Sequence, residues 1–192
     1  MKRSFLIIIA IVFTFNYVAA QKSFRVGAGF DVVFPASDYN DIAKTGVGGS
    51  LLMDYAFSPE FMLTLSSTYS SHGTELPVIG IDGKVIEFDI ESIDILLGGR
   101  YYVSPSFFGL LEAGARYLKL YADIYDAADN NTSGESTEYK AYFTAGFGLG
   151  YRYNLAENKS DFELTGIYHF VSGDVMNFPT FTMRASILIY VF

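Results

Sequence analysis

The chain has 192 residues, of which 51% are hydrophobic and 17% aromatic, and it carries a formal net charge of −8 with no cysteine. The lack of cysteine excludes disulfides, zinc sites of the cysteine type and anchoring through a lipid-modified cysteine. The negative charge argues against nucleic acid as a partner, because phosphate contacts need clustered Lys and Arg. We expect no cofactor and no metal.

The first 20 residues have the three parts of a secretory signal peptide. Lys2 and Arg3 form a positive start, residues 5–15 are apolar apart from Thr14, and residues 18–20 provide a small-residue cleavage site. We therefore expect a cleaved signal at residues 1–20 and one mature domain at residues 21–192. The alternative is a retained membrane helix, for which the apolar stretch is short.

Residues 24–34 form the first segment in which apolar and polar side chains alternate. Its even positions are apolar, from Phe24 to Phe34, whereas its odd positions include Arg25 and Asp31. Strands that cross a membrane need about 9–11 residues and alternate between lipid and lumen. Similar segments follow at residues 47–57, 61–71, 92–103, 107–121, 139–153, 162–171 and 181–192. The pattern predicts an all-β fold, an eight-stranded antiparallel transmembrane up-and-down β-barrel.

Two segments depart from simple alternation. Just before the segment at residues 92–103, apolar residues occupy the even positions Ile86, Phe88 and Ile90, whereas from Ile93 onward they occupy odd positions. This change predicts either a bulge or a strand that extends beyond the membrane. The final residues, 187–192, are apolar at both parities, so their facing stays open.

The connections alternate between short and long. Short links are expected at residues 58–60, 104–106 and 154–161, and longer loops at residues 35–46, 72–86, 122–138 and 172–180. This asymmetry is typical of a barrel with both termini in the periplasm. Aromatic residues gather near the short links and predict a periplasmic girdle, formed by Tyr55, Phe57, Phe61, Tyr101, Tyr102, Phe107, Phe108, Tyr151, Tyr153 and Phe162. A soluble sandwich or lipocalin-like barrel would also alternate, but with its apolar rows turned inward.

Charged residues at inward positions are nearly balanced in sign, and His169 is expected to join them. Eight strands enclose only enough space for side chains, so these charges must pair. The balance favours a structural plug of ion pairs over an ion path or proton relay. The inward glycines at positions 146, 148 and 150 are expected to relieve crowding rather than to bind phosphate. The predicted interior network comprises Arg25, Asp31, Asp54, Asp94, Arg100, Glu112, Arg116, Lys140, Arg152, Glu163, His169 and Arg184.

The excess negative charge is expected in the outer loops. It suits a solvated surface, divalent-cation bridging to lipopolysaccharide or docking of a basic partner. His72 is expected to be a loop residue, and His169-x-x-Ser172 is a weak hint of a nucleophile pair near the outer rim. We expect no catalytic residues. The acidic set is Asp38, Asp41, Glu75, Asp82, Glu87, Asp89, Glu91, Asp123, Asp126, Asp129, Glu135, Glu138 and Asp174.

The chain resembles the small eight-stranded outer-membrane proteins, the family that includes the OmpX, OmpW and OmpA-barrel types, in a form similar to those of Bacteroidota. The resemblance covers the whole mature chain and rests on the Ala19-Ala20-Gln21 junction, the Tyr/Phe-rich strands and the terminal Phe192. It implies that Tyr190 and Phe192 form the C-terminal signal that the barrel insertion machinery reads. It also implies contact with outer-membrane lipid and lipopolysaccharide.

Together these patterns predict a non-enzymatic bacterial outer-membrane barrel with a plugged interior. The expected role is structural or interactive: envelope stability, adhesion or service as an accessory subunit with a protein partner. The alternatives are a narrow conduit for small solutes or ions and, less favoured, a lipid A-modifying enzyme.

Overall fold

The computed structural model describes residues 24–41, 43–73, 78–79, 85–125, 132–136, 138–155, 159–172 and 177–191. The expected signal peptide and Phe192 lie outside these residues, as do Glu75, Asp82, Asp126, Asp129 and Asp174 of the acidic set. Across the part of the chain that is described, no helix has the length and apolar character needed to cross a membrane.

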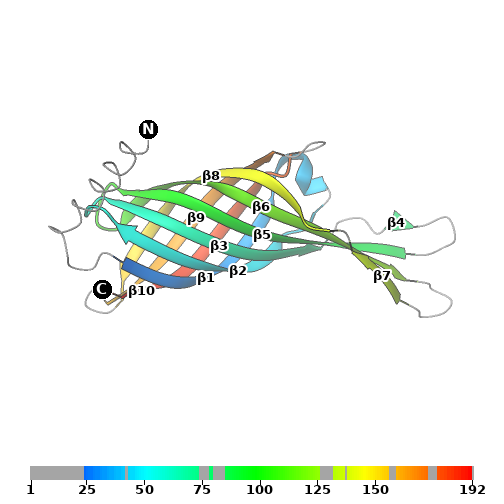
Figure 1. Cartoon of the computed structure of the whole chain (residues 1–192), viewed down its shortest axis with the longest axis horizontal. Coiled ribbons are helices and arrows are strands. Elements are labelled where there is room, and N and C mark those ends of the chain that lie inside the picture. The colour runs from blue at the N-terminus through cyan, green and yellow to red at the C-terminus, as the bar shows by residue number, and fades with distance from the viewer. Residues whose placement is uncertain are drawn as a thin grey trace, which may run out of the picture.

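A closed ring of antiparallel strands forms the body of the molecule (Figure 1). Around the ring the order is β5-β3-β2-β1-β10-β9-β8-β6, and β6 pairs back with β5. Within the described residues this is an eight-stranded barrel, as the alternation predicts. The strand bounds are β1 (Phe24–Pro35), β2 (Gly46–Ala56), β3 (Phe61–Gly73), β5 (Val85–Tyr102), β6 (Phe107–Tyr125), β8 (Lys140–Asn154), β9 (Ser160–Ser172) and β10 (Thr180–Tyr190).

The barrel is apolar outside and polar inside. On β1, Phe30 is 58% exposed while the next residue, Asp31, is fully buried. Because side chains alternate along a strand, this orientation repeats around the ring. A lipocalin-like fold would bury its apolar rows, so that alternative is wrong. On β10, Ile187 and Ile189 face outward and Leu188 inward, which gives the facing of these three residues that the sequence leaves open.

The two ends of the barrel differ in their connections. At one end, here called the turn end, lie the short turns and the first and last described residues, Phe24 and Val191, where the backbone amide of Val191 donates to the carbonyl of Phe24 at 3.0 Å. Two of these turns share a Ser-Pro sequence. Ser58 Oγ accepts hydrogen bonds from the amides of Glu60 and Phe61, and Ser104 Oγ accepts one from the amide of Phe107. The serine hydroxyl thus closes each turn as a local cap.

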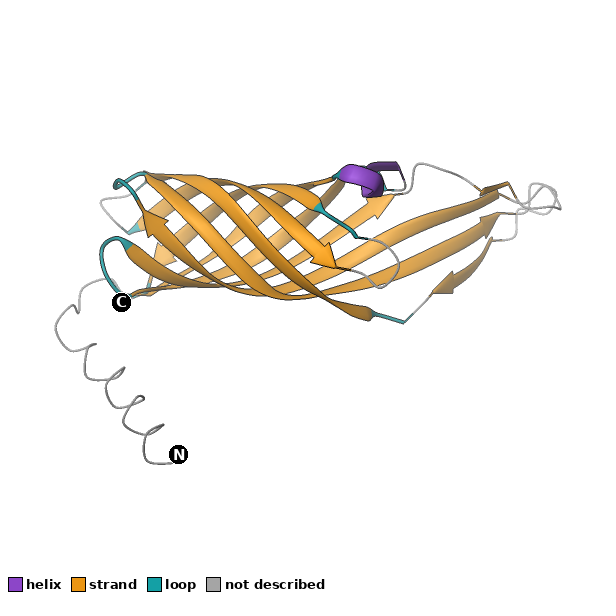
Figure 2. Ribbon diagram, turned by 90° about the horizontal axis from the view of Figure 1, so that it is seen from above, coloured by secondary structure: helices purple, strands orange, loops and turns teal. Residues whose placement is uncertain are grey.

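At the opposite end, here called the loop end, β5 and β6 run well past the other barrel strands (Figures 1 and 2). Their pairing is unbroken from Val85 opposite Tyr125 to Tyr102 opposite Phe108. Of the two explanations for the parity change before residue 92, the extended strand is therefore correct and the bulge in this strand is not.

Two further strands flank this extension: β4 (Val78–Ile79) on β5 and β7 (Thr132–Ser136) on β6. On β6, Leu118 pairs with Lys140 of β8 and Tyr121 pairs with Ser136 of β7. The two positions are three residues apart on β6, but their partners are four residues apart in the chain. The line of β8 thus continues into β7 across a one-residue irregularity. The expected loops at residues 72–86 and 122–138 are therefore partly strand, because the ladder continues beyond the ring.

A short 3₁₀ helix, η2 (Ser37–Asp41), lies at the loop end. Its Tyr39 is only 3% exposed and packs with Ala43 and Ile90. The Tyr39 ring also meets the Phe178 ring edge-on at 5.4 Å between centroids. Ile90 points inward because this cap replaces the polar lumen with apolar packing at the level of η2, which explains the change of parity.

His72 is a strand residue rather than a loop residue. It lies in β3, is 3% exposed, and its imidazole nitrogens lie 3.2 Å from Ser70 Oγ and 3.2 Å from the Lys44 carbonyl. The even parity that it shares with Thr68 and Ser70 would have placed it inside.

Candidate functional site: the barrel interior

Near the turn end, Arg25 is the centre of an ion-pair cluster. Its Nη2 lies 2.6 Å from Asp54 Oδ2, and its Nη1 lies 2.7 Å from Asp161 Oδ2 and 3.0 Å from Glu163 Oε1. Asp54 is the cross-strand neighbour of Arg25 on β2, whereas Asp161 and Glu163 come from β9. All four side chains are at most 1% exposed. One guanidinium thus ties together strands that are not neighbours in the ring.

Arg100 of β5 makes a second bridge in the same cluster. Its Nη1 pairs with Glu163 Oε2 and lies 3.3 Å from Asp54 Oδ2. The hydroxyl of Tyr102 accepts from Arg25 at 3.1 Å and donates to Glu163 at 3.3 Å. The cluster therefore contains two buried arginines and three buried carboxylates, which share their donors and acceptors.

Arg152 and Tyr190 close the cluster toward the turn end. The Arg152 guanidinium stacks over the Tyr102 ring at 4.5 Å, donates twice to the Pro105 carbonyl and lies 4.0 Å from Asp161. Its side chain is 18% exposed. The Tyr190 hydroxyl donates to Asp161 Oδ2 at 2.8 Å. With Arg152 included, the cluster is balanced at three positive and three negative groups.

Two ion pairs lie between neighbouring strands farther toward the loop end. Arg116 and Asp94 face each other on β6 and β5 and form two hydrogen bonds of 2.7 Å. Arg184 and Asp31 face each other on β10 and β1, with Nε 2.6 Å from Oδ1. The second pair bridges the first and last strands of the barrel, so it stabilises the strand pairing that closes the ring.

Between these groups, Glu112 of β6 meets His169 of β9. Their Oε1 and Nε2 atoms are 2.7 Å apart, although β8 lies between the two strands. Gly146 of β8 is the register partner of both residues. A Cβ on Gly146 would lie 2.5 Å from the His169 ring. The glycine therefore allows the pair to form across the backbone of β8.

The predicted interior residues are placed as follows. Eleven of the twelve lie in the barrel lumen, ten of them buried and Arg152 half-buried at the turn end. Lys140 shares their parity, but it is exposed at the start of β8, above the level of the ion pairs. Alternation gives the facing of a residue but not its height along the strand, which is why the sequence places Lys140 in the network.

The expected girdle is also only partly on the outer wall. Tyr55, Phe57, Phe61, Tyr101, Phe107, Tyr151, Tyr153 and Phe162 face outward near the turn end, with ring contacts such as Phe107–Tyr151 at 4.9 Å. Tyr102 and Phe108, in contrast, are 5% and 1% exposed and point inward. Adjacent strand residues face opposite ways, so Tyr101 and Tyr102 cannot both belong to the girdle.

Sequence reasoning missed Asp161 as an interior residue. It is fully buried and bonded to Arg25, Asn154 and Tyr190. Its odd parity, shared with Glu163, was the signal, but Asn154 to Asp161 has the composition of a turn. The structure begins β9 at Ser160, one residue before Asp161.

The structure separates the two members of the His169-x-x-Ser172 hint. His169 is buried and paired with Glu112, whereas Ser172 is exposed on the opposite face of β9. Three residues along a strand reverse the facing, so no histidine–serine pair forms here. Within the described ranges, no group of three or more His, Asp or Glu side chains is placed to hold a metal ion.

Comparison with known proteins shows likeness at the level of structure. No protein-family model matches the chain, and no curated protein sequence matches it. Among solved structures, it is similar to Ail, the attachment invasion locus protein of Yersinia pestis, with a TM-score of 0.60 and 15% identity over 88% of this chain and 100% of that one. A structure of Ail in complex with the heparin analogue sucrose octasulfate matches with a TM-score of 0.52 and 17% identity, over 87% and 97% of the two chains.

Neisserial surface protein A is also similar, with a TM-score of 0.53 and 13% identity over 87% of this chain and 96% of that one. At these identities the likeness is one of fold. The chain therefore has the small closed β-barrel fold found in these bacterial surface proteins.

Proposed function

We propose that the protein is a bacterial outer-membrane barrel with a sealed interior, and that its role is to present the loop-end extension to a protein partner. The outward apolar rows support the membrane location, because exposed faces of this size are unfavourable in water at about 25 cal/mol per Å². Closure supports it as well, since lipid offers no partners for an open strand edge. Outer-membrane lipid and lipopolysaccharide then surround the barrel.

In the proposed orientation both termini and the short turns are periplasmic, and the extension reaches outward. Short turns opposite long loops are typical of this arrangement. Tyr190 and Phe192 would be read by the insertion machinery during biogenesis. After insertion, the Tyr190 ring has a second use, because its hydroxyl bonds Asp161 within the ion-pair cluster.

The sealed interior rests on one observation: buried ion pairs cross the lumen between strands that are not neighbours in the ring. Arg100 of β5 reaches Glu163 of β9, and Arg25 of β1 reaches the same carboxylate. Breaking a buried pair costs several kcal/mol, so the groups that fill the lumen are strongly held. The pairing of these lumen charges supports a non-conducting role, and the role that we propose is also non-enzymatic.

The interactive role rests on the extension. β4, β5, β6 and β7 form a sheet that protrudes beyond the ring (Figure 2). An exposed sheet edge presents unpaired backbone groups that another chain can pair with. The described part of the molecule has no other feature that projects so far from the barrel body.

Planar-bilayer recording tests the sealed interior. We expect the purified protein to insert without steady conductance, and Arg100→Ala, which removes one bridge across the lumen, to raise the frequency of brief openings. Arg152→Ala, which removes a half-buried group, serves as the matched control. Steady ion-selective conductance in the wild type that disappears when Glu112 or Arg116 is replaced would instead establish a conduit.

Co-purification from native membranes tests the interactive role. The shortened variant has an Asn-Gly turn in place of residues 74–88 and another in place of residues 122–135. The first turn joins Gly73 to its paired residue Asp89, and the second joins Tyr121 to its paired residue Ser136. Asn-Gly is a favoured two-residue hairpin turn. We expect a stoichiometric partner with the full chain and its loss with the shortened variant. Retention of the same partner by a shortened barrel that is folded would overturn the role given to the extension.

A further inference from the structure

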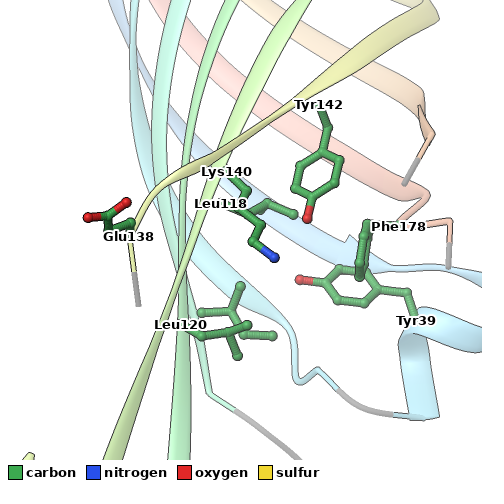
Figure 3. Close-up of a pocket in the computed structure, with 8 residues that line it drawn as sticks. Tyr39, Leu118, Leu120, Glu138, Lys140, Tyr142 and Phe178 are labelled. Atoms are coloured by element: carbon green, nitrogen blue, oxygen red, sulfur yellow. The ribbon is translucent and has the colours of Figure 1, made fainter. Parts of the chain in front are cut away.

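A small cleft at the loop end lies between the η2 cap and the wall formed by β6 and β8 (Figure 3). Its walls are largely apolar and aromatic, and its volume is about 140 Å³. An apolar cavity of roughly 150 Å³ is large enough to bind benzene. The cleft is lined by Tyr39, Ile90, Leu118, Leu120, Glu138, Lys140, Tyr142 and Phe178.

The cleft is held open by aromatic packing rather than by the barrel ladder alone. The Phe178 ring lies between Tyr39 and Tyr142, with centroid distances of 5.4 and 5.7 Å. Tyr39 is buried against Ile90, and Leu118 packs beside it. The shape of the cleft is thus set by side chains from η2, β5, β6, β8 and the segment before β10, which makes it a formed site rather than a surface groove.

One positive charge is directed into this apolar space. In Figure 3 the Lys140 ammonium points toward the hydroxyl-bearing rings of Tyr39 and Tyr142, while the Glu138 carboxylate points away from the cleft. Among the described residues, no carboxylate lies within 4.0 Å of Lys140 Nζ, since every ion pair involves other residues. An ammonium that is not paired with a carboxylate, beside two phenols, is a favourable partner for an anion.

We propose that this cleft binds a small free carboxylate whose other end is a single apolar ring or short chain. The carboxylate pairs with Lys140 and accepts hydrogen bonds from the tyrosine hydroxyls, and the ring lies against Leu118 and Phe178. The volume of the cleft limits the apolar part to about one ring. A tyrosine hydroxyl is protonated at neutral pH and can donate, and burial, which raises the pKa of Tyr39 to about 12, extends this range to higher pH.

The test uses 4-fluorobenzoate as the probe and fluorine NMR as the readout, with the full mature protein in phospholipid nanodiscs. We expect saturable binding of one equivalent that empty nanodiscs do not show. Lys140→Met preserves length and removes charge, so affinity for 4-fluorobenzoate should fall about tenfold or more. Phe178→Ala should weaken binding by removing the apolar wall.

Lys119→Met is the matched control, because Lys119 lies near the same end of the barrel but outside the cleft, with its ammonium 4.2 Å from the centre of the Tyr121 ring. It should leave binding unchanged. Neutral 4-fluorobenzyl alcohol should bind the wild type more weakly than the acid and be indifferent to Lys140→Met. The proposal is overturned by absence of saturable binding, by equal affinity in Lys140→Met, or by tighter binding of 4-fluorobenzylamine than of the acid.

Discussion

At the scale of single residues, the interior is organised around a few arginines, each of which serves several carboxylates. Arg25 alone contacts Asp54, Asp161 and Glu163. A planar guanidinium can do this because its donors fan out in a fixed fork, which the single ammonium of lysine does not provide. The stability of the turn end therefore depends on the geometry of one side chain as well as on its charge.

Replacing Arg25 by Met should lower the free energy of unfolding by about 3–5 kcal/mol, because three buried carboxylates lose their shared partner. Arg25→Lys should recover only part of this loss. Urea unfolding in lipid vesicles, followed by tyrosine fluorescence, provides the measurement. Arg152→Met is the control, with a smaller effect expected from its half-buried position. An Arg25→Met barrel as stable as the wild type would contradict the assignment of Arg25 as the centre of the cluster.

Tyr39 makes the stability of the cap depend on pH in the alkaline range. Burial raises its pKa from 10.0 to about 12. The unfolded phenol ionises near pH 10 while the folded phenol stays protonated, so the contribution of Tyr39 to stability is constant below pH 10 and falls between pH 10 and 12. The difference in 295 nm absorbance titration between wild type and Tyr39→Phe should show one phenol that titrates near pH 12. A difference curve centred at pH 10 would show that Tyr39 is exposed to solvent.

Residue parity predicted most of the interior, and its failures have physical causes. The inward facing of Arg25, Asp54 and Arg184 follows from alternation alone. The exposure of Lys140 does not, because parity carries no information on where the rim lies. Asp161 was missed because local turn composition and strand membership conflict there, and the ion pair with Arg25, 136 residues away, decides between them.

At the scale of elements, neighbouring strands interlock through glycines that leave room for a side chain from the next strand. Gly150 of β8 faces Phe108 of β6 across the ladder, and a Cβ on Gly150 would lie 2.2 Å from the Phe108 ring. The prediction that the inward glycines relieve crowding agrees with this contact. Phe108 itself packs under the Arg100 guanidinium at 5.1 Å, so the ring has little space to move.

Gly150→Ala should destabilise the barrel by about 1–3 kcal/mol through overpacking. Gly109→Ala is the matched control on the partner strand, since a Cβ there meets nothing within 4 Å. The double change Gly150→Ala with Phe108→Leu should regain part of the loss. The urea midpoint and the gel-mobility difference between folded and heated protein report the outcome. Equal stability of the two alanine variants would show that Phe108 can move aside.

The length of β5 and β6 illustrates what pattern alone does not determine. The change of apolar parity near Ile90 predicted an anomaly but allowed two explanations. The choice depends on η2, a segment about 50 residues earlier in the chain, whose Tyr39 covers Ile90. Tertiary packing thus decides between a bulge and an extended strand, two local structures that the sequence pattern alone does not distinguish.

At the scale of the whole molecule, ring closure makes the barrel independent of its extension. The ion pairs and the apolar cluster of Met62, Tyr102, Phe108, Leu110 and Ile167 all belong to the ring itself. The direction of the faces could be predicted from the sequence because it follows from a period of two. The eight-strand count and the difference between the turn and loop ends could be predicted because they follow from the number of alternating segments and the lengths of the links between them. The extension and the cap could not, because they depend on pairing beyond the ring.

The shortened variant defined above should therefore unfold with a free energy within about 1 kcal/mol of the full chain, as expected for changes away from a core. Urea titration of both proteins in the same vesicles provides the comparison. A much lower midpoint for the shortened variant would show that the extension supports the ring, and the loss of a partner would then have to be attributed to unfolding.

The continuity of β5 and β6 has a mechanical consequence. A partner that held the distal sheet and pulled along the barrel axis would load these two strands lengthwise. Because their ladder runs without a break from Val85 to Tyr102, the hydrogen bonds would resist in shear, all together, instead of peeling apart one after another. A load applied to the distal sheet would thus be carried into the wall of the barrel by β5 and β6 together.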